Sequence, residues 1–60
     1  MNSWNSGDLL KSKESGQYVT FIAFSQKNEG CFIGTDTDGI TYTDWLIHKF
    51  EKVEVPNAKN

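Results

Sequence analysis

The stretch from residue 30 to residue 44 constrains the fold more than any other part of the chain. It reads as a short apolar run at residues 31–33, then a polar turn, and then a run of β-forming residues. At the turn, Asp38 and Gly39 are residue types that enter the left-handed backbone region of a tight hairpin, and glycine does so without a Cβ clash. The sequence therefore predicts a β-hairpin.

Three further strands are predicted around this hairpin. Residues 7–13 read as a first strand, and residues 17–24 form the strongest strand pattern in the chain. Residues 50–55 alternate apolar and charged side chains, which is typical of a half-buried strand. Polar turns at 14–16 and 25–30 separate the strands, because glycine and small polar residues favour turn conformations.

The segment between the hairpin and the last strand has a different pattern. Leu46, Ile47 and Phe50 fall at the spacing of three and four residues that is typical of one helix face. Thr43 or Asp44 would serve as its N-cap. A segment this short predicts one or two turns of α or 3₁₀ helix packed as a lid.

Gly34 and the last strand complete the predicted architecture. A glycine inside the first arm of the hairpin indicates a bulge or a sharply bent strand. In the last strand Phe50, Val53 or Val55 faces inward, so the register stays open, and Pro56 ends the strand. The predicted fold is mostly β: a five-stranded antiparallel small barrel or strongly bent sheet, with one short helical turn before the last strand.

The size of the chain sets its expected organisation. Sixty residues make a single domain, with a core at 7–55 and flexible tails at 1–6 and 56–60. A chain this short buries only about 60% of the surface that it exposes when unfolded, so it needs additional stabilisation. One cysteine and one histidine, Cys31 and His48, allow neither an intrachain disulfide nor a four-ligand zinc site. Self-association, most simply a two-fold homodimer, is therefore expected.

Charge and composition indicate where the protein is located and which class of partner it binds. The N-terminal residues are polar and lack the parts of a secretion signal, and no apolar run approaches the roughly 20 residues that cross a bilayer. With a lone thiol, a cytoplasmic location without membrane contact is expected. The net charge is −2, from six lysines, eight carboxylates and no arginine. Such a chain is poorly equipped to bind a polyanion, so nucleic acid is not expected as a partner.

No set of residues predicts catalysis. Cys31 lies in a strand with no cationic neighbour in sequence to stabilise a thiolate, and His48 stands alone in a short turn. The run from Asp36 to Gly39 resembles a calcium loop only superficially, because its glycine is fourth and an EF-hand needs it sixth. The chain is predicted not to be an enzyme, and no cofactor or metal is expected.

The aromatic and acidic side chains predict a binding surface instead. The strand at 17–24 is apolar on both faces, so its second face is either covered by loops or meets another chain. Acidic residues of the hairpin beside exposed aromatic rings would suit a protein partner with a basic surface. Two alternatives stay open: Trp4 caps the core or marks a contact, and Trp45 is a core or a surface residue. The residues predicted to contact a partner are Trp4, Tyr18, Phe21, Asp36, Asp38, Tyr42, Asp44 and Trp45.

The chain resembles the SH3-like small barrels, including KOW- and Tudor-type modules. The residues that carry the resemblance are Gly7-Asp8-Leu9-Leu10, Gly30, Gly34, Asp38-Gly39 and Phe50-Glu51-Lys52-Val53. The chain lacks the aromatic opening of true SH3 domains and the basic loops with which KOW modules touch RNA. In size it also resembles small bacterial and phage proteins, many of which bind one host protein.

The resemblance implies a small non-catalytic protein-binding module, of the kind that binds and modulates or inhibits a host protein. The alternative is a KOW-like nucleic-acid-associated module that uses Lys11, Lys13, Lys27 and Lys49.

Overall fold

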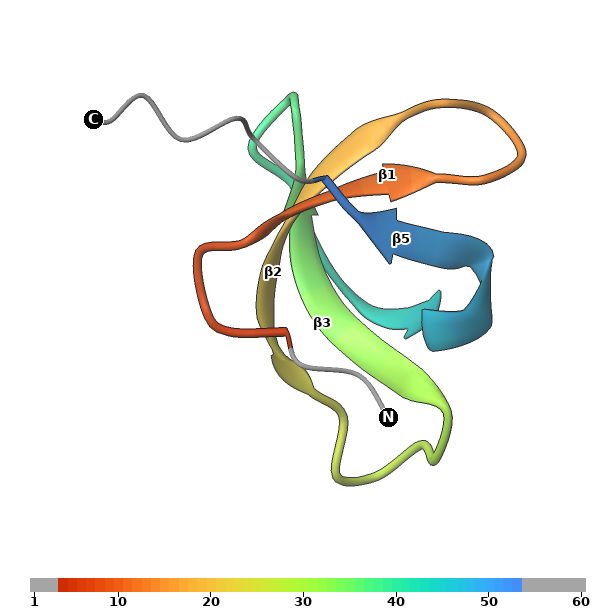
Figure 1. The fold of residues 1–60 in the computed structure, drawn as a ribbon. Coiled ribbons are helices and arrows are strands. Elements are labelled where there is room, and N and C mark those ends of the chain that lie inside the picture. Colours follow the sequence, from red (N-terminus) through yellow and green to blue (C-terminus); the bar gives the residue numbers. More distant parts are fainter. Residues whose placement is uncertain (1–3, 54–60) are drawn as a thin grey trace.

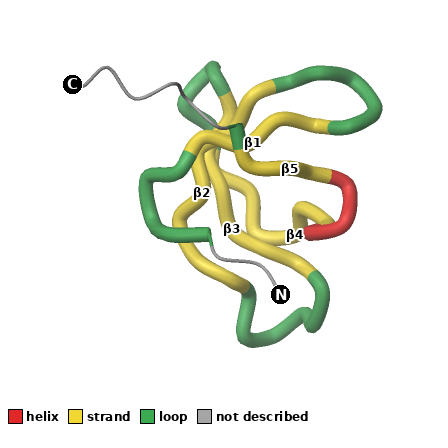
Figure 2. The backbone as a smooth tube through the Cα atoms, in the orientation of Figure 1, coloured by secondary structure: helices red, strands yellow, loops and turns green. Residues whose placement is uncertain are grey.

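A computed structural model describes residues 4–53, which form one antiparallel sheet of five strands in the order β4-β3-β2-β1-β5 (Figure 1). A single 3₁₀ turn, η1, precedes the last strand (Figure 2). The sheet is strongly bent but not closed, because β4 and β5 lie at its two margins. The mostly-β prediction is confirmed in its bent-sheet form. The elements are β1 (Leu9–Ser12), β2 (Tyr18–Phe24), β3 (Cys31–Asp36), β4 (Thr41–Leu46), η1 (Ile47–Lys49) and β5 (Phe50–Lys52).

The predicted hairpin is present as β3 and β4, which are joined by residues 37–40. The Asp36 N–H donates to the Ile40 carbonyl at 3.0 Å, and the Gly39 N–H donates to the Asp36 carbonyl at 3.0 Å. The Asp36 carboxylate also accepts bonds from the N–H groups of Asp38 at 2.9 Å and Ile40 at 3.0 Å. Gly39 has a φ of +83°, as this loop type requires.

Replacing Gly39 with valine is expected to destabilise the fold by about 1–2 kcal/mol, because a β-branched residue pays this penalty in the left-handed region. The added Cβ would meet no other atom, so conformation alone causes the loss. Urea unfolding measures the change in free energy. Gly39→Asn is the control and should lose less, because asparagine tolerates this conformation. A valine variant as stable as the parent would contradict the positive φ.

The core lies on the concave side of the sheet and consists largely of aromatic rings. Its buried members are Leu10, Val19, Phe21, Phe32 and Phe50. Because Val19 and Phe21 alternate with exposed neighbours along β2, one face of that strand points inward. Of the two apolar faces expected from the sequence, the one that carries Val19 and Phe21 is therefore the buried one.

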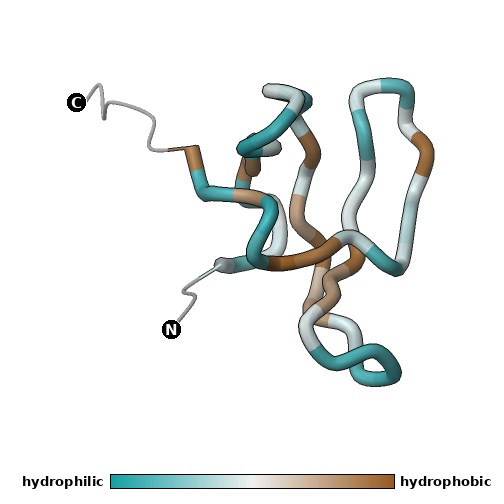
Figure 3. Tube along the Cα trace, turned by 90° about the vertical axis from the view of Figure 1, so that its right-hand side faces the viewer, coloured by the Kyte–Doolittle hydropathy of each residue, from teal (hydrophilic) through white to brown (hydrophobic). Residues whose placement is uncertain are grey.

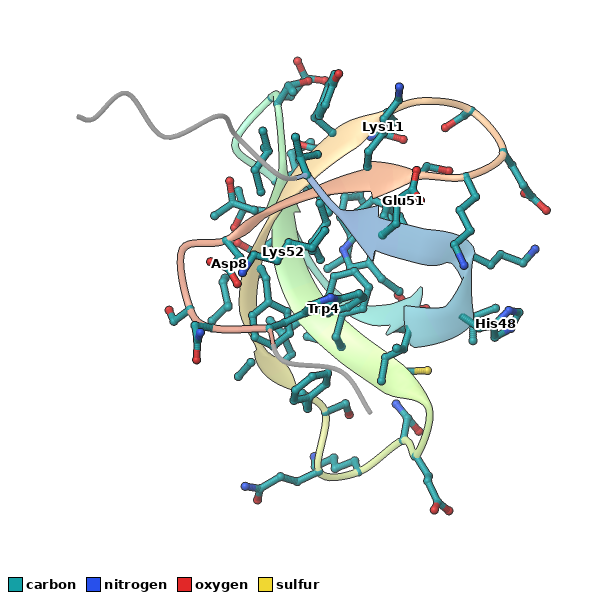
Figure 4. All side chains as sticks on the ribbon, in the orientation of Figure 1. Trp4, Asp8, Lys11, His48, Glu51 and Lys52 are labelled. Atoms are coloured by element: carbon teal, nitrogen blue, oxygen red, sulfur yellow. The ribbon has the colours of Figure 1, made fainter. Side chains whose placement is uncertain are left out.

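Trp4 closes one side of this core. Its ring lies 5.5 Å from Phe21 and 5.3 Å from Phe32, both edge-on, and stacks on Phe24 at 5.9 Å. Figure 4 shows it lying across the bend of β2 and β3. Of the two alternatives for Trp4, core capping is confirmed.

Two bulges next to Gly34 account for the bend. In β2, Phe21 pairs with Gly34 and Ala23 with Ile33, so Ile22 is an extra residue. In β4, two residues stand opposite Ile33 alone, because Phe32 pairs with Trp45 and Gly34 with Tyr42. Bulges increase local twist and bend the strand that carries them. The predicted irregularity at Gly34 is confirmed.

The predicted helical turn is present but shorter and later than expected. Strand β4 continues through Leu46, and η1 covers only three residues. The N-cap is Leu46, which makes no side-chain cap bond, so the prediction of Thr43 or Asp44 as the cap is wrong. Both of those residues are held in β4, where strand pairing outweighs the local helical spacing.

The structure shows which residues after η1 face inward, in part. Phe50 faces inward and is 7% exposed, and Val53 is half-buried. Strand β5 ends at Lys52, whereas Val55, Pro56 and the predicted C-terminal tail lie outside the described residues. Within residues 4–53, no helix has the length and apolar character needed to cross a membrane.

Candidate functional site

Three of the residues predicted to contact a partner lie in or against the core. Phe21 is 3% exposed, so it is a core residue and is not available to a partner. Trp4 and Trp45 are half-buried and pack on the same core. Phe21 was misplaced because it shares the inward face of β2 with Val19, and the sequence pattern did not show which face was buried.

Tyr18 and Asp36 both line a small hollow on the sheet, whereas Asp38 does not. Tyr18 is exposed on the convex face, where the Lys11 ammonium lies 5.8 Å from its ring centre. The Asp36 carboxylate is engaged in the turn described above, whereas Asp38 is exposed at the tip of the hairpin. These three residues do not form one surface with the core-packed tryptophans.

The remaining predicted residues come together on β4. The Tyr42 ring contacts Trp45 edge-on at 4.7 Å and remains 39% exposed. Trp45 is anchored because its Nε1–H donates to the Gly34 carbonyl at 3.3 Å. Asp44 is exposed in the bulge between them. The acidic-aromatic surface predicted from the sequence thus has its structural counterpart on this strand.

Strand β4 also has a backbone edge that no other described strand covers. It lies at the margin of the sheet, next to β3 only. Ile40 and Ile47 both form backbone hydrogen bonds with the β3 side of the hairpin. Because hydrogen-bonding direction alternates along a strand, the N–H groups of the adjacent residues Thr41 and Leu46 point away from β3. We call this outward side of Thr41–Leu46 the β4 edge.

A hollow of about 480 Å³ adjoins the β4 edge on the convex face. Ala23 and Ile33 lie opposite one another beneath it, and Thr43 brings it to β4. The loop that joins β2 to β3 forms its wall and is the hydrophilic stretch at the bottom of Figure 3. We call this space the loop hollow. Its lining residues are Ala23, Phe24, Ser25, Gln26, Lys27, Asn28, Ile33 and Thr43.

Charge is distributed unevenly between the two margins of the sheet. Residues 31–46 contain three aspartates and no basic residue. On the opposite side, Lys52 pairs with Asp8 at 3.4 Å, as Figure 4 shows, and Lys49 pairs with Glu14 at 3.2 Å. Among the described residues, neither Asp38 nor Asp44 forms an ion pair, so the β4 side keeps its negative charge.

Cys31 and His48 do not form a reactive pair in the described structure. Cys31 is half-buried in β3 opposite Leu46, and the His48 side chain projects outward from η1 (Figure 4). Within residues 4–53, no group of three or more histidine, cysteine or carboxylate side chains could hold a metal ion. The chemistry available at the β4 edge is therefore backbone hydrogen bonding, aromatic contact and negative charge.

Comparisons with known proteins identify no relative from which a function could be inferred. No protein-family model, curated protein or solved structure matched the chain significantly. The β4 edge with its flanking charge is accordingly taken as the candidate site.

Proposed function

We propose that the chain is a small non-catalytic protein-binding module that pairs with an extended segment of its partner through the β4 edge. The observation that carries this proposal is the uncovered margin at β4, six residues long, beside the exposed ring of Tyr42. An exposed sheet edge is a template for strand addition, in which main-chain bonds supply affinity and adjacent pockets supply specificity. The loop hollow is such a pocket.

The other margin of the sheet supports the choice of β4. Strand β5 has only three residues, two of them the charged Glu51 and Lys52. Short length and charged side chains are the usual means by which proteins protect a sheet edge. Strand β4 is twice as long and contains neither lysine nor proline, and the features that protect its edge are confined to Asp44 and the bulge at residues 43–44.

The fold of the chain supports the same kind of module. The return of β5 to pair with β1, after a 3₁₀ turn, supports an SH3-like arrangement. We propose that the chain is a cytoplasmic bacterial or phage protein that binds and modulates or inhibits a host protein. A different protein is favoured over a second copy, because seven of the eight aromatic rings already contact one another within one chain.

Nucleic-acid binding is the rival, and the lysines give it little support. Lys49 is paired with Glu14, and Lys11 lies over the Tyr18 ring and opposite Glu51. Titration with mixed-sequence DNA and RNA at low and moderate salt tests this rival directly. We expect no submicromolar binding, and such binding with a steep salt dependence would overturn the proposal.

Leu46→Pro tests the use of the β4 edge. Leu46 has φ −83° and ψ 124°, close to the φ of about −65° that proline imposes, and its N–H points away from β3. The substitution therefore removes an outward donor without breaking the hairpin. Leu46→Thr is the matched control, because it also removes the leucine side chain but keeps the N–H.

Proteins from an extract of the source cells are captured on the parent chain, and the one retained is purified and titrated by calorimetry. We expect Leu46→Thr to bind within a few-fold of the parent and Leu46→Pro to bind about ten-fold more weakly, as loss of one backbone bond predicts. Equal binding by the two variants would show that the partner uses another surface.

A further inference from the structure

We infer that the segment received by the β4 edge carries a lysine or arginine that lies against Asp44, and that Asp44 disfavours pairing with a second copy of the chain. This inference rests on the proposed function and specifies the chemistry of the partner. It follows from the position of a single charge on the strand and from the charges around it.

The hairpin carries negative charge that no described residue neutralises. Asp44 is the only charged residue of β4, and it is exposed without an ion-pair partner among the described residues. Asp38 adds a second carboxylate at the tip, and residues 31–46 include no cation. By contrast, Asp8 and Glu14 are paired with lysines, and Glu51 lies opposite Lys11. The negative potential at the β4 side is therefore available to a basic partner.

Pairing of β4 with β4 of a second copy would be opposed by charge and by the bulge. Two copies that joined β4 to β4 would be antiparallel and related by a two-fold axis. The midpoint of Thr41–Leu46 lies between Thr43 and Asp44. An axis there sets each Asp44 opposite Thr43 of the second copy and diagonal to the second Asp44, and like charges on paired strands are destabilising. The bulge at the same two residues further interrupts a regular ladder.

The neighbours of Asp44 on β4 are an exposed aromatic ring and the loop hollow. Tyr42, two residues away, has an exposed ring, and a cation can lie over the face of that ring. Thr43 borders the loop hollow, which is apolar at Ala23 and Ile33 and basic at Lys27, so an apolar side chain suits the hollow and the basic one suits Asp44. An extended segment with one basic residue and an apolar neighbour matches these features. A segment with an acidic residue at the same place would meet Asp44 and be rejected.

Three synthetic heptapeptides of alternating threonine and valine test the inference, with lysine, threonine or glutamate at the centre. Each is titrated into the isotopically labelled full chain at low salt, and amide chemical shifts are followed. We expect shifts along Thr41–Leu46, with affinity in the order lysine, threonine, glutamate. Asp44→Asn should reduce the lysine preference by about two- to five-fold, the value of an exposed ion pair. Asp38→Asn, the matched control, should reduce it less.

The outcomes separate this inference from the proposed function. Shifts at β4 that are equal for the lysine and glutamate peptides would overturn the role of Asp44 and leave strand addition in place. Shifts confined to other strands, or none up to millimolar peptide, would overturn both. Sedimentation equilibrium adds an independent readout, in which Asp44→Asn should self-associate more than the parent and Thr43→Asn should not. An Asp44→Asn chain that stays as monomeric as the parent would contradict the exclusion of self-pairing.

Discussion

Replacing Phe32 with alanine is expected to destabilise the chain by about 3–5 kcal/mol, which is the range for removing a buried phenylalanine. Phe32 is 0% exposed and stands at the centre of the aromatic core. Its ring lies 5.3 Å from both Trp4 and Phe50, with Phe21 at 5.8 Å and Trp45 at 6.4 Å. Its removal would leave a cavity that four large rings cannot fill without losing contacts with one another.

A loss of this size equals the whole stability that a core of about 60 residues usually supplies. The alanine variant should therefore be unfolded at 25 °C, with the near-ultraviolet circular dichroism of its tryptophans lost. Phe32→Leu should retain a cooperative urea transition at a lower midpoint. Phe24→Ala is the control on the same face and should cost less, because Phe24 is 38% exposed whereas Phe32 is fully buried. An alanine variant at Phe32 with the parent's midpoint would contradict the central position of this ring.

The parts of the fold that could be predicted from the sequence depend on local signals. The β3–β4 hairpin was predictable because Gly39 and the Asp36 carboxylate determine the loop within five residues of chain. Val19 and Phe21 could be placed on one face because alternation along a strand is fixed by backbone geometry. Gly34 could be read as a bend because a glycine inside a strand usually marks a bulge or a close approach of two backbones.

The parts that could not be predicted depend on contacts between distant residues. The helical spacing of Leu46, Ile47 and Phe50 gave the wrong boundary, because Trp45 and Leu46 pair with β3 and extend β4. The expectation of a homodimer rested on an aromatic content too high for one small core. A bent sheet instead allows rings to pack edge-on against each other, as Trp45 does on Phe50 at 5.3 Å. Self-association stays a prediction, with less physical need for it.

The candidate site was predicted only in part, for the same reason. Tyr42, Asp44 and Trp45 lie near one another on β4 because they are close in sequence, and the Tyr42 and Trp45 rings are in contact. That β4 lies at the margin of the sheet follows from the pairing of β1 with both β2 and β5, which the sequence does not encode locally. The unpaired edge, and the loop hollow beside it, therefore appear only in the folded chain.

Replacing Gly34 with valine is expected to destabilise the fold by about 1–3 kcal/mol, the usual cost of overpacking a core. A Cβ at this position would lie 3.0 Å from the Thr20 carbonyl oxygen and 3.0 Å from the Phe32 ring. Neither neighbour can move freely, since the first belongs to the backbone of β2 and the second is fixed by four rings. The bend between the two bulges thus depends on the absence of a side chain here.

Urea unfolding measures this loss, and Ala23→Val serves as the control. Ala23 is an exposed residue of β2 that faces the loop hollow, so the added methyl groups meet open space there. The environment of Trp45 gives a second readout, because its Nε1–H donates to the Gly34 carbonyl and should shift as the backbone is displaced. If the Gly34 variant matched the control in both stability and tryptophan fluorescence, the close approach of β2 and β3 would not exist in solution. The curvature of the sheet, which lets seven aromatic rings pack together, would then need another cause.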